Sequence, residues 1–262
     1  MSFIIAIANE KGGVGKTTST LSLGAAISET NQRVLVIDLD PQANLTLSLG
    51  YKPNSLQRSM VNVMMGDQRI SSLILTTSVD RLDLAPSNHD MHLTEDFLRI
   101  RKDYHELLRD ALAEVPDYDY IIIDCPPSVG ALTQSALASS DLHILPTQCE
   151  YFSTHAIRSS LALIRDIRDK SNPLLRYRLL LTMCDPNNRL HQSLNDQIRK
   201  IFGGAVFNSV IEVDDNLREC PLYAQPITTF APQSLGALQY RQLAQELIQY
   251  ARETIRRSSQ AA

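Results

Sequence analysis

The stretch EKGGVGKTT, residues 10–18, places three glycines within four positions and puts a lysine on each side of them. An apolar, β-branched run, Phe3–Ala8, precedes it, and residues with helical spacing follow over Thr17–Ser28. A glycine-rich turn between a strand and a helix lets backbone N–H groups and the helix N-terminus surround a phosphate. We therefore expect a phosphate-binding loop. The alternative, a glycine turn with incidental lysines, leaves the acidic residues after later strands unexplained.

The residues of this loop have separate expected roles. Four consecutive backbone amides are expected to face the phosphates, where glycine permits close approach and positive φ: Gly12, Gly13, Val14 and Gly15. The ammonium of Lys16 is expected to reach the β- and γ-phosphates, the Thr17 hydroxyl to bind Mg²⁺, and Thr18 to contact the α-phosphate. ATP and Mg²⁺ are therefore the expected cofactors.

Strand-like and helix-like segments alternate along the whole chain. Apolar runs that fit strands buried on both faces occupy residues 3–8, 34–37, 120–123, 143–145, 179–183 and 206–211, with shorter ones near 73–75 and 82–84. Helical spacing covers residues 17–28, 56–65, 91–101, 104–114, 154–169, 193–202 and 235–257. This order predicts an α/β fold with a doubly wound, mostly parallel sheet flanked by helices. No repeat or linker interrupts it, so we expect residues 1–262 to form a single domain.

The composition is that of an ordinary globular chain, with 44% hydrophobic residues, 21% charged residues and a net charge of −4. Residues 1–130 carry a charge of −6 and residues 131–262 a charge of +2, so the excess of basic residues lies late in the chain. No apolar run approaches the ~18 residues of a spanning helix. A strand-like run starts at residue 3 without a signal-peptide pattern, so we expect a cytoplasmic location.

The cysteines do not form a recognisable metal or disulfide pattern. There are four of them, without a C-x-x-C pair: Cys125, Cys149, Cys184 and Cys220. We expect reduced, mostly buried thiols that behave as small apolar residues.

Acidic residues end two of the apolar runs. Asp38 and Asp40 follow residues 34–37, and Asp124 follows residues 120–123. Ligands bind at this carboxyl edge in open α/β sheets, and a carboxylate such as Asp124 can hold Mg²⁺ through water. The alternative for Asp38 and Asp40 is that they cap a turn. A nucleophilic triad has no support, because His155 and His191 are isolated in the sequence.

The loop departs from the usual pattern G-x-x-x-x-G-K-[ST], because Glu10 occupies the first glycine position and Lys11 follows it. The form K-G-G-x-G-K-T resembles the deviant Walker A box of the ParA/MinD class of ATPases. This resemblance implies an ATP-dependent homodimer in which Lys16 contacts its own subunit's nucleotide and Lys11 the nucleotide of the other subunit. A lysine donated in this way offsets the repulsion between two triphosphates. The alternative for Lys11 is a solvated loop residue.

Two further segments resemble the switch regions of the same class. Residues 36–44, VIDLDPQAN, are similar to switch I, which implies that Asp40 orients the attacking water and Asp38 supports the Mg²⁺ shell. Residues 124–128, DCPPS, are similar to switch II. The catalytic residues implied by the resemblance are Lys11, Lys16 and Asp40. The implied metal-site residues are Thr17, Asp38 and Asp124.

Later segments extend the resemblance over nearly the whole chain. Residues 146–152, PTQCEYF, are similar to the stretch that opens the dimer-facing helix in ParA-type proteins. Met183 falls in a segment similar to the one near the adenine, and Arg218 and Pro221 in one linked to DNA binding and nucleotide contact. Because only two residues precede the first strand, the chain is most similar to short ParA forms without an N-terminal DNA-binding domain.

Those short forms imply a function. As ATP dimers they bind DNA non-specifically and associate with the nucleoid, and a ParB-like or other small adaptor stimulates their weak hydrolysis. The result is the positioning or segregation of a cargo, such as a plasmid, a chromosome region or a carboxysome. Arg218 is the first expected DNA contact, and three basic residues upstream add phosphate-neutralising charge: Arg189, Arg199 and Lys200. For each of the four, a solvated surface charge is the alternative.

Two other functions stay open. A MinD-like regulator would dock a basic amphipathic tail on a membrane, and the last predicted helix carries an apolar stripe beside arginines: Leu243, Leu247, Ala251 and Ile255. The tail after Arg257 has no large apolar residue, so we expect the stripe to pack on the sheet, without stable membrane association. A P-loop ligase or an iron–sulfur reductase is the second alternative, although Cys125 alone does not resemble a cluster site.

Overall fold

The strands form one sheet in the computed structural model, which describes residues 2–101, 103–115, 117–150 and 153–261. Their order is β3-β4-β2-β5-β1-β6-β7-β8. β3 is antiparallel to β4, and the other neighbouring pairs are parallel. The bounds are β1 (Phe3–Ile7), β2 (Val34–Asp38), β3 (Leu75–Thr76), β4 (Leu82–Ala85), β5 (Tyr120–Asp124), β6 (Leu142–Gln148), β7 (Arg176–Cys184) and β8 (Val206–Glu212).

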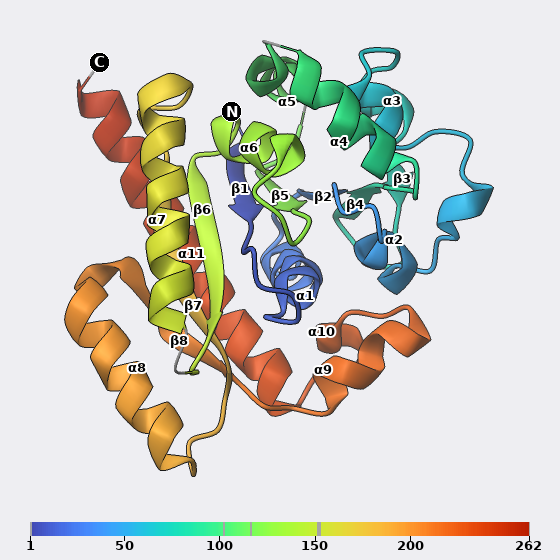
Figure 1. The fold of residues 1–262 in the computed structure, drawn as a ribbon. Helices are drawn as coiled ribbons and strands as arrows, with labels where there is room; N and C mark the ends of the chain where they lie inside the picture. The colour runs from blue at the N-terminus through green and yellow to red at the C-terminus, as the bar shows by residue number, and fades with distance from the viewer. Residues whose placement is uncertain (1, 102, 116, 151–152, 262) are drawn as a thin grey trace.

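Helices cover both faces of this sheet (Figure 1). One face carries α1 (Lys16–Ser28), α2 (Asn44–Ser48), α9 (Asn216–Glu219), α10 (Ile227–Phe230) and α11 (Leu235–Ala261). The other face carries α3 (Met60–Met64), α4 (Met91–Ile100), α5 (Tyr104–Ala113), α6 (Ala131–Ala138), α7 (Ser153–Lys170) and α8 (Arg189–Phe202). Short 3₁₀ turns are η1 (Pro53–Ser55), η2 (Ile70–Ser72), η3 (Gly203–Ala205) and η4 (Cys220–Tyr223).

The central strands are buried on both faces because their alternate side chains enter two different cores. In β1, Ile5 and Ile7 pack with α1 and α11, whereas Ala6 packs with the helices on the opposite face. Successive side chains of a strand point to opposite faces, so an uninterrupted apolar run is what a doubly covered sheet requires. The predicted fold class, a doubly wound and mostly parallel sheet, is confirmed.

Local predictions differ from the structure at several places. The expected helix over residues 56–65 is only Met60–Met64, because Ser59 caps it: its hydroxyl accepts from the Val61 amide, and its own amide donates to Asn62 Oδ1. The expected strand near 73–75 is the two-residue edge strand β3. Helix α6 was not expected, because nearly all of its small residues are buried and no apolar stripe marks one face.

The strand order brings several loops to one edge. β1 lies between β5 and β6, and β5 lies between β1 and β2. In register, Ile7 is opposite Asp124, and Asp38 is opposite Asp124. The segments that follow β1, β2, β5, β6 and β7 therefore start beside one another, and the candidate site lies there.

Candidate functional site

Residues 9–15 connect β1 to α1 and expose a helix N-terminus. Gly13 and Gly15 have φ values of 73° and 85°, in the left-handed region that glycine adopts without strain. Gly15 is the N-cap of α1, and no side chain caps this helix start in the structure. The amides of its first turn are thus available to an anion, and the positive end of the helix dipole favours one.

Lys16 is held at the start of α1 with its ammonium turned back over the loop. Its side chain is buried, and Nζ donates to the Lys11 carbonyl at 3.2 Å. Burial lowers the pKa of Lys16, while the nearby carboxylates of Asp124 and Asp40 act in the opposite direction. A phosphate placed in the loop would supply the compensating charge, so the expected role of Lys16 fits its position.

Three carboxylates meet beside this lysine. Asp38 and Asp124 are fully buried and Asp40 nearly so. Burial raises the pKa of all three, that of Asp38 to about 7, and the charge of Asp38 raises that of Asp124 further. The Thr17 hydroxyl donates to Asp124 Oδ2 at 2.7 Å. A hydroxyl and a carboxylate are oxygen ligands of the kind that a hard divalent cation such as Mg²⁺ prefers, so Thr17 and Asp124 fit the expected metal site.

Asp38 also organises the segment that follows β2. Its Oδ1 accepts from the Asp40 amide at 3.0 Å, and its Oδ2 accepts from the amide and hydroxyl of Thr46 at 2.9 and 2.7 Å. Asp40 accepts in turn from the Gln42 amide at 2.9 Å. The turn-capping role considered for both aspartates is therefore present, and it fixes Asp40 near Lys16 rather than competing with a role in the site.

Lys11 lies at the rim of the loop, with its side chain 40% exposed. Its Nζ donates to Gln148 Oε1 at 2.8 Å and forms an ion pair with Glu150. Gln148 Nε2 donates in turn to the Gly13 carbonyl at 3.2 Å and lies 2.9 Å from Met183 Sδ. In this isolated subunit the ammonium is thus docked on the end of β6.

The remaining expected nucleotide contacts line two hollows, and Thr18 lines both of them. One hollow is lined by Gly15, Thr18, Met183, Arg218 and Tyr240, among others. The second is lined by Thr17, Thr18, Asn44, Cys220 and Pro221, among others. Met183 and Pro221 are thus both placed next to the phosphate-binding loop.

Some polar residues of the site were missed by the sequence reasoning. Asn9 donates to the Pro146 carbonyl at 2.7 Å and accepts from the Lys11 amide at 3.0 Å. The Thr182 hydroxyl donates to the carbonyl of the buried Val14 at 2.9 Å. Asn9 and Gln148 are polar residues at or just after the end of an apolar strand, and this is the signal that would have found them.

The four expected DNA contacts do not form one cluster. Arg218 is exposed on α9, where its Nη1 lies 3.5 Å from Asp215 Oδ1. Arg189, Arg199 and Lys200 are on α8, which packs on the opposite face of the sheet. Arg199 donates to the carbonyls of Phe207 and Asn208, so its guanidinium holds β8 to α8. Tyr151 and Phe152, in the stretch similar to a dimer-facing segment, lie outside the described residues.

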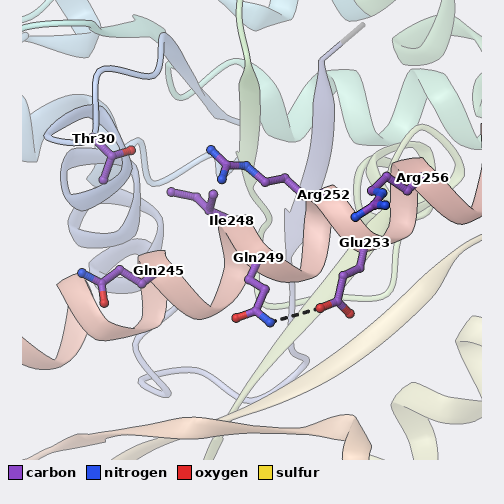
Figure 2. A pocket seen from close by; sticks show the side chains of 7 residues that line it. All are labelled: Thr30, Gln245, Ile248, Gln249, Arg252, Glu253 and Arg256. Carbon is purple, nitrogen blue, oxygen red and sulfur yellow. Dashed lines mark hydrogen bonds between the residues drawn. The ribbon is translucent and has the colours of Figure 1, made fainter.

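Most apolar residues of the last helix, α11, are buried in the core. Leu243, Leu247 and Ala251 are buried against the sheet and α1, as expected, whereas Ile255 is half exposed. Figure 2 shows Arg252 and Arg256 lining a groove between α11 and Thr30, which follows α1. Thr30 is at the end of α1 remote from Lys16, about 20 Å along the helix axis. No helix among the described residues is long and apolar enough to cross a bilayer.

Comparisons with known proteins agree with this geometry. A protein-family model described as an AAA domain matches residues 2–177. The sporulation initiation inhibitor protein Soj of Bacillus subtilis is 37% identical over 94% of this chain and 98% of its own. The chromosome partitioning protein ParA of Caulobacter vibrioides is 34% identical over 95% of each chain. Cobyrinic acid a,c-diamide synthase from Mycobacterium smegmatis, solved with an ATP analog and magnesium, superimposes with a TM-score of 0.84 at 33% identity, covering 95% and 96% of the two chains.

Proposed function

This chain belongs to the AAA-domain family and is related to Soj and to the chromosome partitioning protein ParA, and on that premise we propose that it is an ATP-switched positioning protein. It is a P-loop ATPase that uses ATP with Mg²⁺. In the proposed cycle, ATP drives formation of a homodimer, the dimer binds DNA non-specifically, and an adaptor protein stimulates hydrolysis. The outcome is the placement of a cargo such as a plasmid, a chromosome region or a protein assembly.

The geometry of the loop and the acidic cluster supports the binding step. The amides of residues 12–15 and the start of α1 hold the phosphates, and Lys16 neutralises charge on them. Thr17 and Asp124 would hold Mg²⁺, which stabilises negative charge on the phosphate oxygens when bound. Asp38 keeps residues 40–46 in place through its three hydrogen bonds.

Asp40 is the residue proposed to act on the attacking water. Burial raises its pKa, so its carboxylate is a stronger base than an exposed aspartate, and the Gln42 amide fixes one of its oxygens. Phosphoryl transfer to water needs positioning and charge neutralisation more than covalent chemistry. Asp40 would orient the water and accept its proton, while Lys16 stabilises the charge that develops on the phosphoryl oxygens.

Lys11 carries the proposal that the active form is a dimer. Lys16 is buried inside the loop, whereas the half-exposed Lys11 lies at its rim. The long side chain of Lys11 can break its contacts with Gln148 and Glu150 by rotating about its own bonds. An ammonium at the rim can reach a second triphosphate brought against this face, where it offsets the repulsion between the two nucleotides. This placement of two lysines is the single observation that favours a dimer over an ordinary monomeric ATPase.

Lys11→Ala tests the dimer directly. With a slowly hydrolysed ATP analogue and Mg²⁺, the unmodified protein is expected to elute as a dimer in size exclusion with light scattering. The Lys11→Ala variant is expected to bind the analogue but to stay monomeric. Lys52→Ala removes an exposed lysine elsewhere and should dimerise normally. Equal dimerisation of Lys11→Ala and Lys52→Ala would exclude the proposed role of Lys11.

A ligase function is the second candidate, because the M. smegmatis structure that superimposes on this chain carries the name of an amide-forming synthase. A ligase would turn over ATP only with a small acid substrate. Phosphate release from the purified protein with ATP and Mg²⁺ alone, increased by DNA, would favour the positioning function. Turnover that depends strictly on an added acid would favour the ligase.

A MinD-like membrane cycle has less support. The apolar residues of the α11 stripe up to Ala251 are buried and would have to leave the core to enter a bilayer. Sedimentation with anionic vesicles and ATP distinguishes the two functions, since the proposal requires binding to DNA and not to lipid.

A further inference from the structure

Two buried thiols approach each other at the same edge of the sheet. Cys149 follows β6 and Cys184 is the last residue of β7, so 35 positions of sequence separate them. Their sulfur atoms are only 3.0 Å apart, while both thiols are unbridged. β6 and β7 are paired in parallel with Gln148 opposite Thr182. Cys149, one residue beyond Gln148, therefore lies near Cys184, two residues beyond Thr182.

The pair is connected to the residues that hold Lys11. Cys149 stands between Gln148 and Glu150, the two side chains that bind the Lys11 ammonium. Cys184 follows Met183, whose sulfur lies 2.9 Å from Gln148 Nε2. A covalent link between the two cysteines would therefore tie together the residues beneath the rim of the phosphate loop.

We propose that Cys149 and Cys184 are an oxidation site, at which a hydroperoxide converts the two thiols into a disulfide that keeps Lys11 docked on its own subunit. The bridging reaction stands on the sulfur–sulfur geometry alone. The effect on Lys11 rests on the proposed function, because it matters only where Lys11 acts across a dimer interface.

The chemistry needs no group other than the two thiols and the peroxide. The Cys149 thiolate attacks the peroxide O–O bond, giving a sulfenic acid and releasing hydroxide, which takes up a proton to become water. The Cys184 sulfur then attacks the Cys149 sulfur, the S–O bond breaks, and a second water leaves. The two sulfurs lose two electrons in total, and one molecule of hydrogen peroxide is reduced to two of water.

Cys149 is the better first nucleophile of the two. The hydrogen bond from Cys184 lowers the pKa of Cys149, and the positive charge of Arg199 acts in the same direction. The same hydrogen bond and burial raise the pKa of Cys184. Small thiols of a reducing compartment would reverse the bridge by exchange, so the modification is transient.

The other two cysteines provide internal controls. Cys125 Sγ is directed at the Ile123 carbonyl and Cys220 Sγ at the Leu217 carbonyl, so each faces backbone oxygen instead of a second sulfur. Burial raises the pKa of Cys220 to about 11, which disfavours its thiolate. Both should remain thiols under a dose of peroxide that oxidises the pair.

The test counts thiols and then maps the bridge. The full chain is treated with hydrogen peroxide, denatured, and alkylated with a maleimide of known mass. Intact mass is expected to show four labels before treatment and two after it, and peptide mapping should join the peptides that contain Cys149 and Cys184. Cys149→Ser and Cys184→Ser should each abolish the bridge, whereas Cys125→Ser and Cys220→Ser should retain it. Either serine variant of the pair suffices if the other does not fold.

Four labels after treatment, a bridge that involves another cysteine, or only oxygen addition at Cys149 would overturn the oxidation site. A second measurement, dimerisation with the ATP analogue, addresses Lys11. Oxidation should abolish the dimer in the unmodified protein, a reducing thiol should restore it, and Cys184→Ser should be insensitive. A bridge that leaves dimerisation intact would exclude the coupling. A reduced protein that never dimerises would instead contradict the proposed function, while the mass measurement would still decide the oxidation site.

Discussion

The surroundings of Asp40 set the chemical properties on which its proposed role depends. An isolated aspartate after a strand is ordinarily a weak base or a turn cap. Here burial raises its pKa, the Lys16 charge opposes that shift, and the Gln42 amide fixes its orientation. Its position near both Lys16 and Asp124 supports the proposed role with the attacking water.

Asp40→Asn is therefore expected to slow hydrolysis with little loss of ATP binding. The amide keeps the size of the side chain and can still accept from Gln42, but it has no charge and cannot take a proton. The rate of phosphate release should fall by roughly 10²-fold or more, measured with a coupled assay at saturating ATP. Asp67→Asn, an exposed aspartate outside the site, should hydrolyse ATP normally. An unchanged rate in Asp40→Asn would remove Asp40 from this step.

His143 is a buried side chain whose protonation should affect stability. It lies in β6, next to β1, with Nε2 3.0 Å from the Ala8 carbonyl, so the neutral ring carries its hydrogen on Nε2. The buried Nδ1 has no hydrogen-bond partner among the described residues. Protonation would place a second N–H and a charge in the core, and burial accordingly lowers the pKa of His143 to about 4.

The sign of the pH effect follows from this lowered pKa. Between about pH 6.5 and pH 4 the unfolded chain binds a proton at His143 that the folded protein does not, so stability falls with falling pH. We expect His143 to contribute a loss of about 2 kcal/mol between pH 7.5 and pH 5. Over this pH range, the free energy of unfolding of His143→Gln, measured with urea, should fall by about 2 kcal/mol less than that of the unmodified protein. His89→Gln, at an exposed position, should show the same pH dependence as the unmodified protein. Equal slopes in all three proteins would mean that His143 titrates normally.

At the scale of elements, α1 depends on one close approach to the sheet. A Cβ built on Gly24 would lie 2.9 Å from Val36 Cγ1 and 3.3 Å from Leu82 Cδ1. The helix can therefore lie close to β2 and β4 only because this position has no side chain. α1 also carries Lys16 and Thr17 in its first turn. The distance between α1 and the sheet therefore determines where the phosphate-binding loop lies relative to the strand ends.

Gly24→Ala is expected to destabilise the protein even though alanine favours helices. The methyl group would force Val36 or the helix to shift, a loss of about 1–3 kcal/mol that exceeds the gain in helix propensity of about 1 kcal/mol. Gly204→Ala is the matched control, because a Cβ there would meet no atom within 4 Å and φ is not positive. Thermal unfolding should show a lower midpoint for Gly24→Ala alone. An unchanged midpoint would mean that α1 moves away from the sheet without loss of stability.

Over the whole molecule, the basic residues of the late part of the chain are divided between two faces. Leu217 of α9 belongs to the core that includes Leu180, whereas Leu194 and Ile198 of α8 belong to the core that includes Leu179 and Leu181. Adjacent residues of β7 point to opposite faces, so α8 and α9 lie on opposite sides of the sheet. One subunit therefore cannot present the four expected DNA contacts as a single patch.

Arg218 and Arg199 should consequently respond differently to substitution. Arg218→Ala should weaken binding to a random DNA duplex and reduce the salt slope of the affinity by about 1, with folding intact. Arg199→Ala should mainly lower stability, because it removes the hydrogen bonds to the carbonyls of Phe207 and Asn208. Fluorescence anisotropy over a range of salt concentrations, with Arg69→Ala as the exposed control, measures the first effect. An Arg218→Ala slope equal to that of Arg69→Ala would exclude Arg218 as a phosphate contact.

Local chemistry in the sequence determined the phosphate loop, the strand-end aspartates and the fold class. A glycine loop between a buried strand and a helix, and an acid at the end of an apolar run, need only neighbours along the chain to be recognised. The sequence alone for this reason predicts one shared edge of the sheet for Lys16, Thr17, Asp38, Asp40 and Asp124, and the structure brings them together there.

Contacts between distant segments were decided only by the tertiary structure. The docking of Lys11 on Gln148 and Glu150 and the meeting of Cys149 with Cys184 depend on the order β1-β6-β7, which no short segment encodes. Helix α6 has no polar face to reveal it, because its surroundings bury nearly every side. The division of α8 and α9 between two faces follows in the same way from the path of the chain through the sheet. Such pairings arise when the whole chain buries its apolar surface at once, so they are properties of the folded molecule.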